Sequence, residues 1–441
     1  MPGSAIKTDK FDAIIIGAGI IGTSIALGLS RSGLKTLNLD TLPAAGYGST
    51  SNSSAIIRPF YSAIENCALA HEARSRWLNW PEFLAAEDES GYARYSECGM
   101  LMLLAEGDQE SFQSSFRSMG QLGITIEHLS TGEIGRRFPI DEMNSFGPPK
   151  LPEDPDFGKP NETPLAGGFY IPQAGYVNDP QLASHNLQRA AETHGAVFKF
   201  NTSVVTINRA NGRVTGIETR EGEVIDAGIV INAAGPHSAK VNLLAGVVDQ
   251  MNITTRAERH EVAHVPVPES TKPDRLFCVI GDGDTGVYMR PETDCNLLIG
   301  SLDPECDGRH YVDADDYDMA LTEQWTRQVW RAAQRLPGLS IPNTAQGVVG
   351  LYDTTPDWVS VYDKSSLPGF YMAIGTSGNQ FKNAPVIGDL MSVLIMACEN
   401  GHDHDNNPVK FHLQHLNHTI DLGFYSRNRT LHTETSGTVL A

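Results

Sequence analysis

The sequence lacks several features that would indicate a secreted, metal-binding or membrane protein. Six cysteines are spread over 441 residues without a CxxC pair, which argues against a zinc knuckle or dithiol motif and favours reduced structural thiols. The first residues show no signal-peptide pattern, and no run of about 18 apolar residues indicates a membrane span. The stretch GHDHDNN (401–407) is typical of a solvated loop, and no zinc-ligand spacing or catalytic triad stands out. We therefore expect a cytoplasmic protein without a metal site.

Positive charge is also scarce. The chain has 33 Lys and Arg residues against 53 Asp and Glu residues, a formal net charge of −20. Nucleic acid and anionic membrane surfaces would be repelled, so neither is an expected partner. A small anion remains possible, because a buried pocket sets its own local field. The length allows two domains or one domain with a large insertion, in a monomer or small homo-oligomer.

A βαβ pattern opens the chain. AIII (13–16) predicts a strand buried on both faces, and GAGIIG follows with glycines in GxGxxG spacing. The next residues predict a helix ending near Gly33, and TLNL (36–39) predicts a second strand closed by Asp40. This order within about 30 residues is typical of dinucleotide-binding proteins.

Each part of this unit has a physical role. The glycines permit a tight turn, close approach of a pyrophosphate and close helix–strand packing. The helix N-terminus offers N–H groups to phosphate. An acid at the end of the second strand would accept a hydrogen bond from a ribose hydroxyl and argues against NADP. The expected cofactor-binding residues are Gly17, Gly19, Ile20, Ile21, Gly22 and Asp40.

Later segments favour FAD over NAD. A loop rich in Gly, Ser and Asn (46–62) follows the acidic strand, and residues 176–198 predict a helix leading into a strand. Residues 201–235 then predict a meander with a turn at Asn211-Gly212 and a closing apolar strand at 228–231. A nucleotide-binding domain that resumes after an interruption fits an FAD fold better. Further expected cofactor contacts are Ser49, Thr50, Ser51, Asn52, Ser53, Val204, Val205, Ala234 and Gly235.

Several motifs together resemble the D-amino-acid oxidase superfamily, closest to its glycine, sarcosine and dimethylglycine oxidase branch. They are GAGIIG, the GST-containing loop ending in IIR, INAAG (231–235) and GLYDTTPD…GTSGNQFKNAPVIGDLMSVLI (350–395). The resemblance implies an α/β fold, a Rossmann-like FAD-binding domain with an inserted mixed β-sheet substrate domain. The FAD-binding parts would be 10–95, 176–245 and 341–400, the substrate parts 96–175 and 246–340, and 401–441 a C-terminal extension.

The resemblance also implies roles for single residues. Arg58, in IIR, would hold a substrate carboxylate, and Arg290, in VYMRP, could supply a second arginine. Lys382 would lie over the flavin near N5 and help oxygen react, and we expect Tyr352 to wall the pocket. The remaining expected flavin contacts are Gly350, Gly378, Asn379, Gln380 and Phe381.

Departures from the family pattern are informative. Some relatives attach flavin through a histidine where this chain has Asn52, and sarcosine oxidases use a cysteine where it has Gly350. Neither link is available here, which predicts non-covalent FAD. A histidine of sarcosine oxidases aligns approximately with Leu302, which disfavours sarcosine itself, and Asn379-Gln380 replaces the common His-Gly.

These observations predict oxidation of the C–N bond of a small amino acid or secondary amine carboxylate. Hydride transfer from Cα to flavin N5 would be followed by reoxidation with O2, giving H2O2, and imine hydrolysis would give an oxoacid plus amine. If Arg58 and Arg290 both point inward, an iminodiacetate-like dicarboxylate becomes attractive. Two alternatives remain: a D-amino-acid or 2-hydroxy-acid dehydrogenase using a quinone or electron-transfer protein, and a non-catalytic flavin-binding scaffold. We interpret His237 and His260 as structural.

Overall fold

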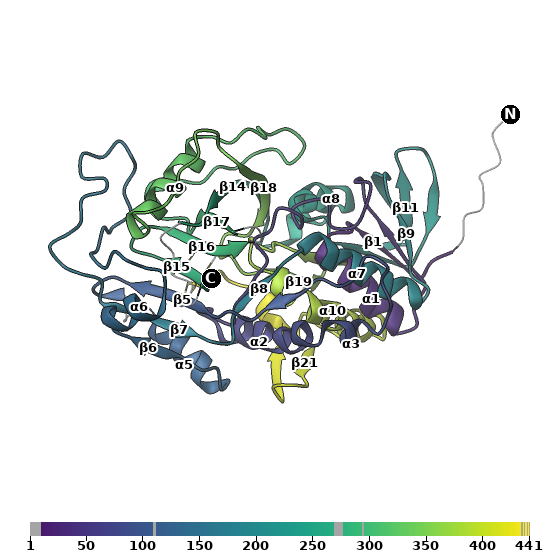
Figure 1. The fold of residues 1–441 in the computed structure, drawn as a ribbon. Helices are drawn as coiled ribbons and strands as arrows, with labels where there is room; N and C mark the ends of the chain where they lie inside the picture. The colour runs from purple at the N-terminus through teal and green to yellow at the C-terminus, as the bar shows by residue number, and fades with distance from the viewer. Residues whose placement is uncertain are drawn as a thin grey trace.

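A computed structural model describes residues 10–108, 112–268, 277–292 and 295–433, together with positions 435, 437, 438 and 440. Two large sheets dominate it, each with its own helices (Figure 1). The predicted architecture, a Rossmann-like domain with a mixed-sheet substrate domain, is confirmed.

The first sheet has six strands and contains the βαβ unit predicted from the sequence. All neighbouring pairs are parallel except β19–β20, which is antiparallel. In spatial order the strands are β19 (Val361–Lys364), β20 (Phe370–Ile374), β13 (Ile229–Asn232), β1 (Ala13–Ile16), β2 (Thr36–Leu39) and β9 (Val197–Lys199). Three distant parts of the chain therefore build one sheet, as the interrupted pattern predicted.

The second sheet has eight strands and is mixed, because β15 and β5 run parallel while the other pairs are antiparallel. In spatial order they are β18 (Gly347–Thr354), β14 (Arg256–Pro266), β17 (Asn296–Ser301), β16 (Val287–Glu292), β15 (Val279–Asp282), β5 (Met100–Leu104), β7 (Gly167–Ile171) and β6 (Glu127–Leu129).

Three smaller sheets complete the strands. They are β10–β11–β12 (Val204–Ala210, Arg213–Thr219, Val224–Asp226), β3–β8–β4 (Ile56–Ile57, Gly175–Val177, Tyr95–Ser96) and β21–β22 (Lys410–Leu413, His418–Asp421). In the first of these, Asn211 and Gly212 form the predicted turn, both with positive φ (52° and 75°).

Helices cover both large sheets, and each sheet with its helices is called a body below. The helices of the first body, around the six-stranded sheet, are α1 (Ile20–Arg31), α2 (Ile64–Leu78), α3 (Trp80–Leu84), α7 (Pro180–Thr193), α8 (Ser238–Ala245) and α10 (Ala384–Glu399). Those of the second are α5 (Gln113–Gln121), α6 (Thr131–Arg137) and α9 (Glu323–Arg335). Short 3-10 turns are η1 (Gly235–His237), η2 (Val248–Gln250), η4 (Glu305–Asp307), η5 (Phe381–Asn383) and η6 (Leu422–Tyr425).

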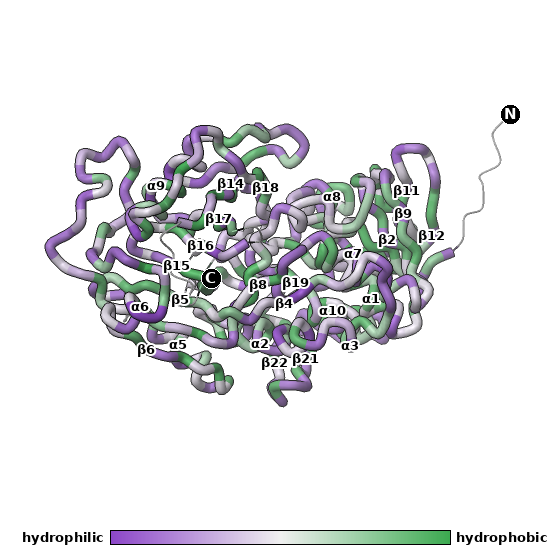
Figure 2. Tube along the Cα trace, viewed as in Figure 1, coloured by the Kyte–Doolittle hydropathy of each residue, from purple (hydrophilic) through white to green (hydrophobic). Residues whose placement is uncertain are grey.

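Apolar residues concentrate along the strands and central helices, whereas the outer loops are hydrophilic (Figure 2). All four residues of β1 are buried, and α1 packs between α7 and α10. One described helical stretch, Phe381–Glu399, is long and apolar enough to cross a membrane, which the sequence reading did not register. Because 72% of its most apolar window is buried and α10 packs against α1 and α2, it serves here as a core helix.

Two segments lie differently from the expected domain ranges. Strand β18 falls within 341–400, assigned to the FAD-binding part, yet it is the edge strand of the eight-stranded sheet. It pairs with β14 along eight residues, and this pairing decides its place. The segment 401–441, expected to be an extension, contributes Phe411, Leu413 and Tyr425 to the core of the first body.

Candidate active site

The glycine turn between β1 and α1 leaves no room for side chains. Gly17 has φ +106°, and a Cβ on it would lie 2.3 Å from the carbonyl oxygen of Ala233. A Cβ on Gly22 would lie 1.9 Å from the carbonyl oxygen of Gly17. Helix α1 starts after Gly19 without a side-chain cap of its own. The turn therefore presents backbone at a helix N-terminus, which suits a pyrophosphate.

Asp40 closes β2 as predicted and faces this turn. Its Oδ2 accepts a hydrogen bond from the Ala18 N–H at 2.6 Å, and its Oδ1 accepts one from the Leu42 N–H at 2.8 Å. Each carboxylate oxygen can accept a second hydrogen bond. The Asp40 carboxylate can therefore still accept a hydrogen bond from a ribose hydroxyl. This role of Asp40 stays a prediction.

The loop after β2 is fastened to the eight-stranded sheet. The Ser49 hydroxyl donates to the Leu351 carbonyl at 2.7 Å, and the Asn52 amide donates to the Val349 carbonyl at 3.1 Å. A Cβ on Gly350 would lie 3.1 Å from the Asn52 Cβ. The two positions at which the family's relatives tether flavin thus meet in space, and here neither carries a reactive side chain.

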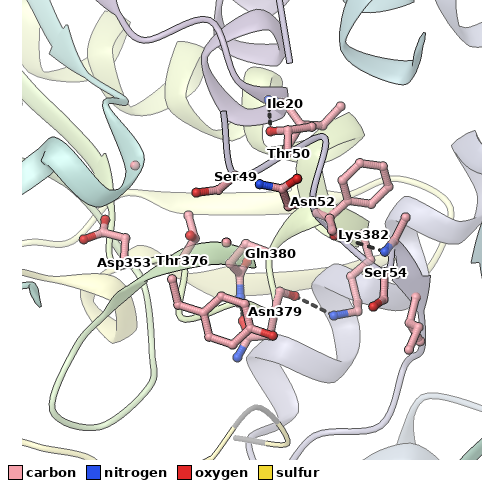
Figure 3. Close-up of a pocket in the computed structure, with 18 of the residues that line it drawn as sticks. Ile20, Ser49, Thr50, Asn52, Ser54, Asp353, Thr376, Asn379, Gln380 and Lys382 are labelled. Atoms are coloured by element: carbon pink, nitrogen blue, oxygen red, sulfur yellow. Dashed lines mark hydrogen bonds between the residues drawn. The ribbon is translucent and has the colours of Figure 1, made fainter. Parts of the chain in front are cut away.

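A cavity lies where residues of the two large sheets meet. Its lining combines apolar and polar side chains, as in a cofactor-and-substrate site. Predicted residues that line it are Gly19, Ile20, Ile21, Ser49, Thr50, Asn52, Ser53, Arg58, Gly235, Gly350, Tyr352, Gly378, Asn379, Gln380, Phe381 and Lys382. Figure 3 shows Asp353 and Thr376 at one end of the pocket and Ser54 and Lys382 at the other.

Two buried cations meet at one wall of this pocket. Lys382 is 3% exposed, and its Nζ donates to the Tyr61 hydroxyl at 2.9 Å and to the Asn379 carbonyl at 2.5 Å. Arg58 is 4% exposed, donates to the Phe60 carbonyl, and places its guanidinium 4.4 Å from the centre of the Tyr61 ring. Burial lowers the pKa of both groups, and the charge of Arg58 lowers the pKa of Lys382 further.

Tyr352 lies at another wall, as expected. Its ring stacks on the His260 ring with centroids 4.0 Å apart, and a Cβ on Gly378 would touch it at 2.4 Å. His260 also lines the pocket. The sequence interprets His260 as structural, yet β14 brings His260 and Val262 into the pocket lining.

Asp353 at the end of β18 is a further buried acid of the pocket. Its Oδ2 accepts from the Gly375 N–H at 2.6 Å, whereas its Oδ1 has no hydrogen bond. Burial raises the pKa of Asp353 to about 7, although the Gly375 N–H works against this rise. Asn379 likewise leaves its buried Nδ2 without a partner. Such orphaned polar atoms fit a bound polar group.

Arg290 does not serve as a second carboxylate anchor. It is 1% exposed and does not line the pocket. Its Nε donates to the Ser54 carbonyl at 2.7 Å, its Nη1 donates to the Pro291 carbonyl at 2.8 Å, and its Nη2 pairs with Glu292 at 2.8 Å. These contacts use the guanidinium internally, which removes the structural basis for a dicarboxylate.

Some predicted cofactor contacts lie outside the pocket lining. Gly17, Gly22, Asp40 and Ala234 belong to the turn region around β1, β2 and β13, and Ser51 donates to the Gly48 carbonyl on the loop surface. Val204 and Val205 begin β10, where Val205 is 38% exposed. The structure does not bring these two valines to the pocket.

The sequence reading missed other lining residues, among them His260, Tyr288, Leu302, Asp353, Thr376 and Leu440. One available signal was the charged run Glu258–Glu261 inside an apolar strand. In β14 the residues alternate: Arg259 pairs with Glu261 at 2.7 Å, and Glu261 caps α9 by accepting from the Trp325 N–H. Glu258 and His260 share the opposite face of the strand, on which His260 stacks on Tyr352 of β18 and lines the pocket.

A glycine turn at a helix N-terminus, an acid after the second strand and a cavity extending to a second sheet define a dinucleotide-binding oxidoreductase. The chain belongs to the family of FAD-dependent oxidoreductases named DAO, which matches residues 12–394. Its cofactor is FAD, and since Asn52 and Gly350 cannot form the family's tethers, FAD is held non-covalently. Among the described residues, no three His, Cys, Asp or Glu side chains are arranged so that they could hold a metal ion.

Relatives cover most of the chain at low identity. FAD-dependent oxidoreductase domain-containing protein 1 of Bos taurus is 23% identical over 437 residues, spanning 89% of this chain and 82% of that protein. L-proline dehydrogenase from P. horikoshii superposes with a TM-score of 0.73 at 20% identity, covering 89% and 95% of the two chains. Glycine oxidase from Geobacillus kaustophilus gives 0.70 at 19% identity, covering 96% and 100%. These likenesses establish the fold.

Proposed function

We propose that this protein oxidises the C–N bond of a small monocarboxylic amino acid or secondary amine. The observation that carries the proposal is the convergence of Arg58 and Lys382 on Tyr61 at one wall of the pocket. Arg58 is 4% exposed and Lys382 is 3% exposed, so a carboxylate that enters the pocket meets two buried groups of complementary charge. The names of the similar glycine oxidase and L-proline dehydrogenase fit such a substrate.

The two cations suit a carboxylate in different ways. A guanidinium offers a planar pair of donors, whereas an ammonium acts as a point charge. Tyr61 lies against both, so their relative position is fixed before substrate arrives. We propose that Arg58 and Lys382 together bind the carboxylate, with Lys382 also available to oxygen as the family resemblance implies.

The flavin supplies the electron acceptor when bound, and the chain supplies position and environment. The wall of Met100, Val262 and Leu302 is apolar and excludes water from the Cα of the substrate. Amine oxidation needs the nitrogen lone pair, so the pocket must also take up the proton of the ammonium. Holding the reacting carbon about 3–3.5 Å from its acceptor is worth far more than general affinity.

We propose O2 as the final acceptor, with H2O2 as the second product. One observation favours the alternative, a dehydrogenase that passes electrons to a quinone or a protein. Arg58 and Lys382 are the arginine and lysine among the described lining residues, and both lie at the proposed carboxylate site. An oxidase would need one of these two groups to assist the reaction with oxygen as well, whereas a dehydrogenase would not.

The test is a panel of amino acids, N-substituted glycines and 2-hydroxy acids, scored by anaerobic bleaching of the purified flavoprotein. We expect bleaching by amine carboxylates and none by the matching amines without a carboxylate. Bleaching by 2-hydroxy acids alone would overturn the proposal. Peroxide formation in air then separates oxidase from dehydrogenase.

A matched pair of arginine variants tests the carboxylate site. Arg58→Met should weaken binding of a carboxylate substrate by about 100-fold or more, since a buried charge-assisted hydrogen bond is lost. Arg136→Met removes an exposed arginine on α6 and should leave binding unchanged. Equal affinities in both variants would remove Arg58 from the site.

A further inference from the structure

His260 lies in a charged cluster beside the pocket that the proposed carboxylate site does not use. It is 7% exposed and stacks on Tyr352. Its Nε2 is 3.5 Å from Glu258 Oε1, and its Nδ1 is 3.6 Å from Asp303 Oδ1. An imidazole at the pocket wall is therefore flanked by a carboxylate near each ring nitrogen.

The cluster has unused hydrogen-bonding capacity. His260 Nε2, Glu258 Oε2 and Asp303 Oδ2 are all buried and have no hydrogen bond. A buried donor or acceptor without a well-formed hydrogen bond is costly, so the members of this cluster do not fully satisfy one another. His260 is the member of this cluster that lines the pocket.

The cluster also contains one arginine and lies near further ionisable groups. Arg309 is the permanent cation among them, with its Nη1 3.3 Å from Glu258 and 3.5 Å from Asp303, and it is 28% exposed. Tyr288 and Tyr352 face the cluster as neutral phenols, and Asp307 adds a more distant negative charge. Burial raises the pKa of Asp303 although His260 and Arg309 work against this rise, whereas the same two residues outweigh burial at Glu258 and lower its pKa.

We propose that His260 accepts the proton of the substrate ammonium, with Glu258 and Asp303 stabilising the imidazolium that forms. The N–H bond of the ammonium breaks, its electron pair stays on nitrogen as the lone pair that oxidation needs, and the proton binds the imidazole. No electron moves in this step. The inference rests on the proposed function and adds a proton acceptor to it.

The position of His260 suits this role. Arg58 and Lys382 come from the segment after the flavin loop and from η5, whereas His260 comes from β14 of the eight-stranded sheet. A substrate held by its carboxylate at the first wall can direct its nitrogen to the second. Histidine is the side chain that titrates near neutral pH, so it can take and release this proton in each turnover.

The experiment uses stopped-flow absorbance on the holoenzyme under anaerobic conditions. It measures, as a function of pH, the ratio of the rate constant for flavin reduction to the apparent Kd of the substrate. With His260 as base, the wild type should remain active at pH values where the free substrate is still cationic, and its acid limb should lie below the pKa of the free amine. His260→Gln can use only substrate that is already neutral in solution. The acid limb of this variant should therefore move to higher pH, towards the pKa of the free substrate amine. In a separate variant, His260→Ala, added imidazole should restore activity near pH 7.

Two further variants make the test independent of how well His260 variants fold. Glu258→Gln removes one charge that stabilises the imidazolium, so the acid limb should move to lower pH, opposite to His260→Gln. His264→Gln places the same substitution on the same strand outside the pocket and should leave the profile unchanged. Unchanged limbs in both His260→Gln and Glu258→Gln would overturn the proposal.

Failure of the proposed function looks different. If no amine carboxylate reduces the wild-type flavin, the substrate class is wrong. If wild type is reduced but its pH profile ignores His260 and Glu258, the substrate class stands and the proton acceptor is another group. A purely structural role would change flavin content or thermal stability without shifting the limb.

Discussion

Lys382 Nζ lies 2.9 Å from the Tyr61 hydroxyl, and the same tyrosine ring carries the Arg58 guanidinium over its face. Two neutral oxygens, from Tyr61 and Asn379, accept hydrogen bonds from this ammonium. They replace part of its hydration but bring no negative charge. Burial and the nearby arginine therefore hold the pKa of Lys382 well below its ordinary value.

Carboxylate binding should consequently be coupled to proton uptake. A bound carboxylate favours charged Lys382, so the pKa of Lys382 is higher in the complex than in the free enzyme. Affinity is then greatest at low pH, where Lys382 is already charged, and falls as pH rises through the lowered pKa of the free enzyme. Titrating the flavin absorbance with an unreactive carboxylate across pH 6–10 measures this slope.

The variant Lys382→Met separates this effect from others. It should bind the carboxylate more weakly at neutral pH, and the fall in affinity with rising pH should disappear. Calorimetry in two buffers of different ionisation enthalpy should show proton uptake for wild type and not for the variant. The same slope in both proteins would show that Lys382 is not the group involved.

The glycine turn gives a second prediction, about cofactor retention. Gly22→Ala places a methyl group 1.9 Å from the Gly17 carbonyl oxygen, so backbone must move in the turn that faces the pyrophosphate. Overpacking of this kind costs about 1–3 kcal/mol, and here it distorts the binding loop itself. Gel filtration followed by absorbance at 450 nm should find most of the flavin lost.

Gly228→Ala is the matched control, because a Cβ at that position meets nothing within 4 Å and Gly228 precedes a strand of the same sheet. It should retain flavin and thermal stability. Full flavin content in Gly22→Ala would mean that the turn relaxes without moving towards the cofactor.

The βαβ unit could be predicted from the sequence because its signals are local. The buried strand at 13–16, the GxGxxG turn and the acid at Asp40 stand within about 30 residues, and the observed β1, α1 and β2 match them closely. The family resemblance then located Arg58 and Lys382, and both line the pocket.

The second sheet was harder to predict, because strand alternation and pairing decide which side chains face the cavity. Arg290 and His260 both lie on strands of this sheet, yet the structure turns the histidine to the pocket and the arginine to Ser54 and Glu292. A one-residue change of register would exchange the two faces. Motif position could not settle that register, and pairing with distant strands did.

A third prediction concerns acid stability of the C-terminal segment. Asp405 pairs with Arg427 at 2.8 Å and with Lys364 at 2.8 Å. Burial works to raise the pKa of Asp405, but these two cations outweigh it and hold the pKa at about 2. Because the pKa of Asp405 is lower in the folded state than in the unfolded state, its ion pairs stabilise the fold at pH values above the ordinary pKa of aspartate. This stabilisation is lost as the pH falls from about 4 towards 2.

Asp405→Asn should therefore lower the free energy of unfolding by about 1–2 kcal/mol at pH 7, allowing for partial exposure of the carboxylate. Near pH 2 the variant and the wild type should converge. Urea unfolding at pH 7 and at low pH measures both. Asp249→Asn, at an exposed acid of the same residue type, provides the comparison and should lie close to wild type at pH 7. A constant difference between Asp405→Asn and wild type at all pH values would contradict the assignment.

The last prediction places the C-terminal segment at the substrate. Leu440 lines the pocket and packs against the apolar cluster of Phe60, Tyr61 and Met100, far along the chain from all three. Leu440→Ala removes apolar contact at the mouth and admits water beside the two cations. Partial burial of the side chain makes this worth about 1 kcal/mol, or roughly fivefold weaker carboxylate binding in the flavin titration. Leu431→Ala, in the same segment but 51% exposed, should bind as wild type does. Equal binding in both variants would show that the segment leaves the pocket in solution, whereas a selective loss in Leu440→Ala makes these last residues part of the substrate site.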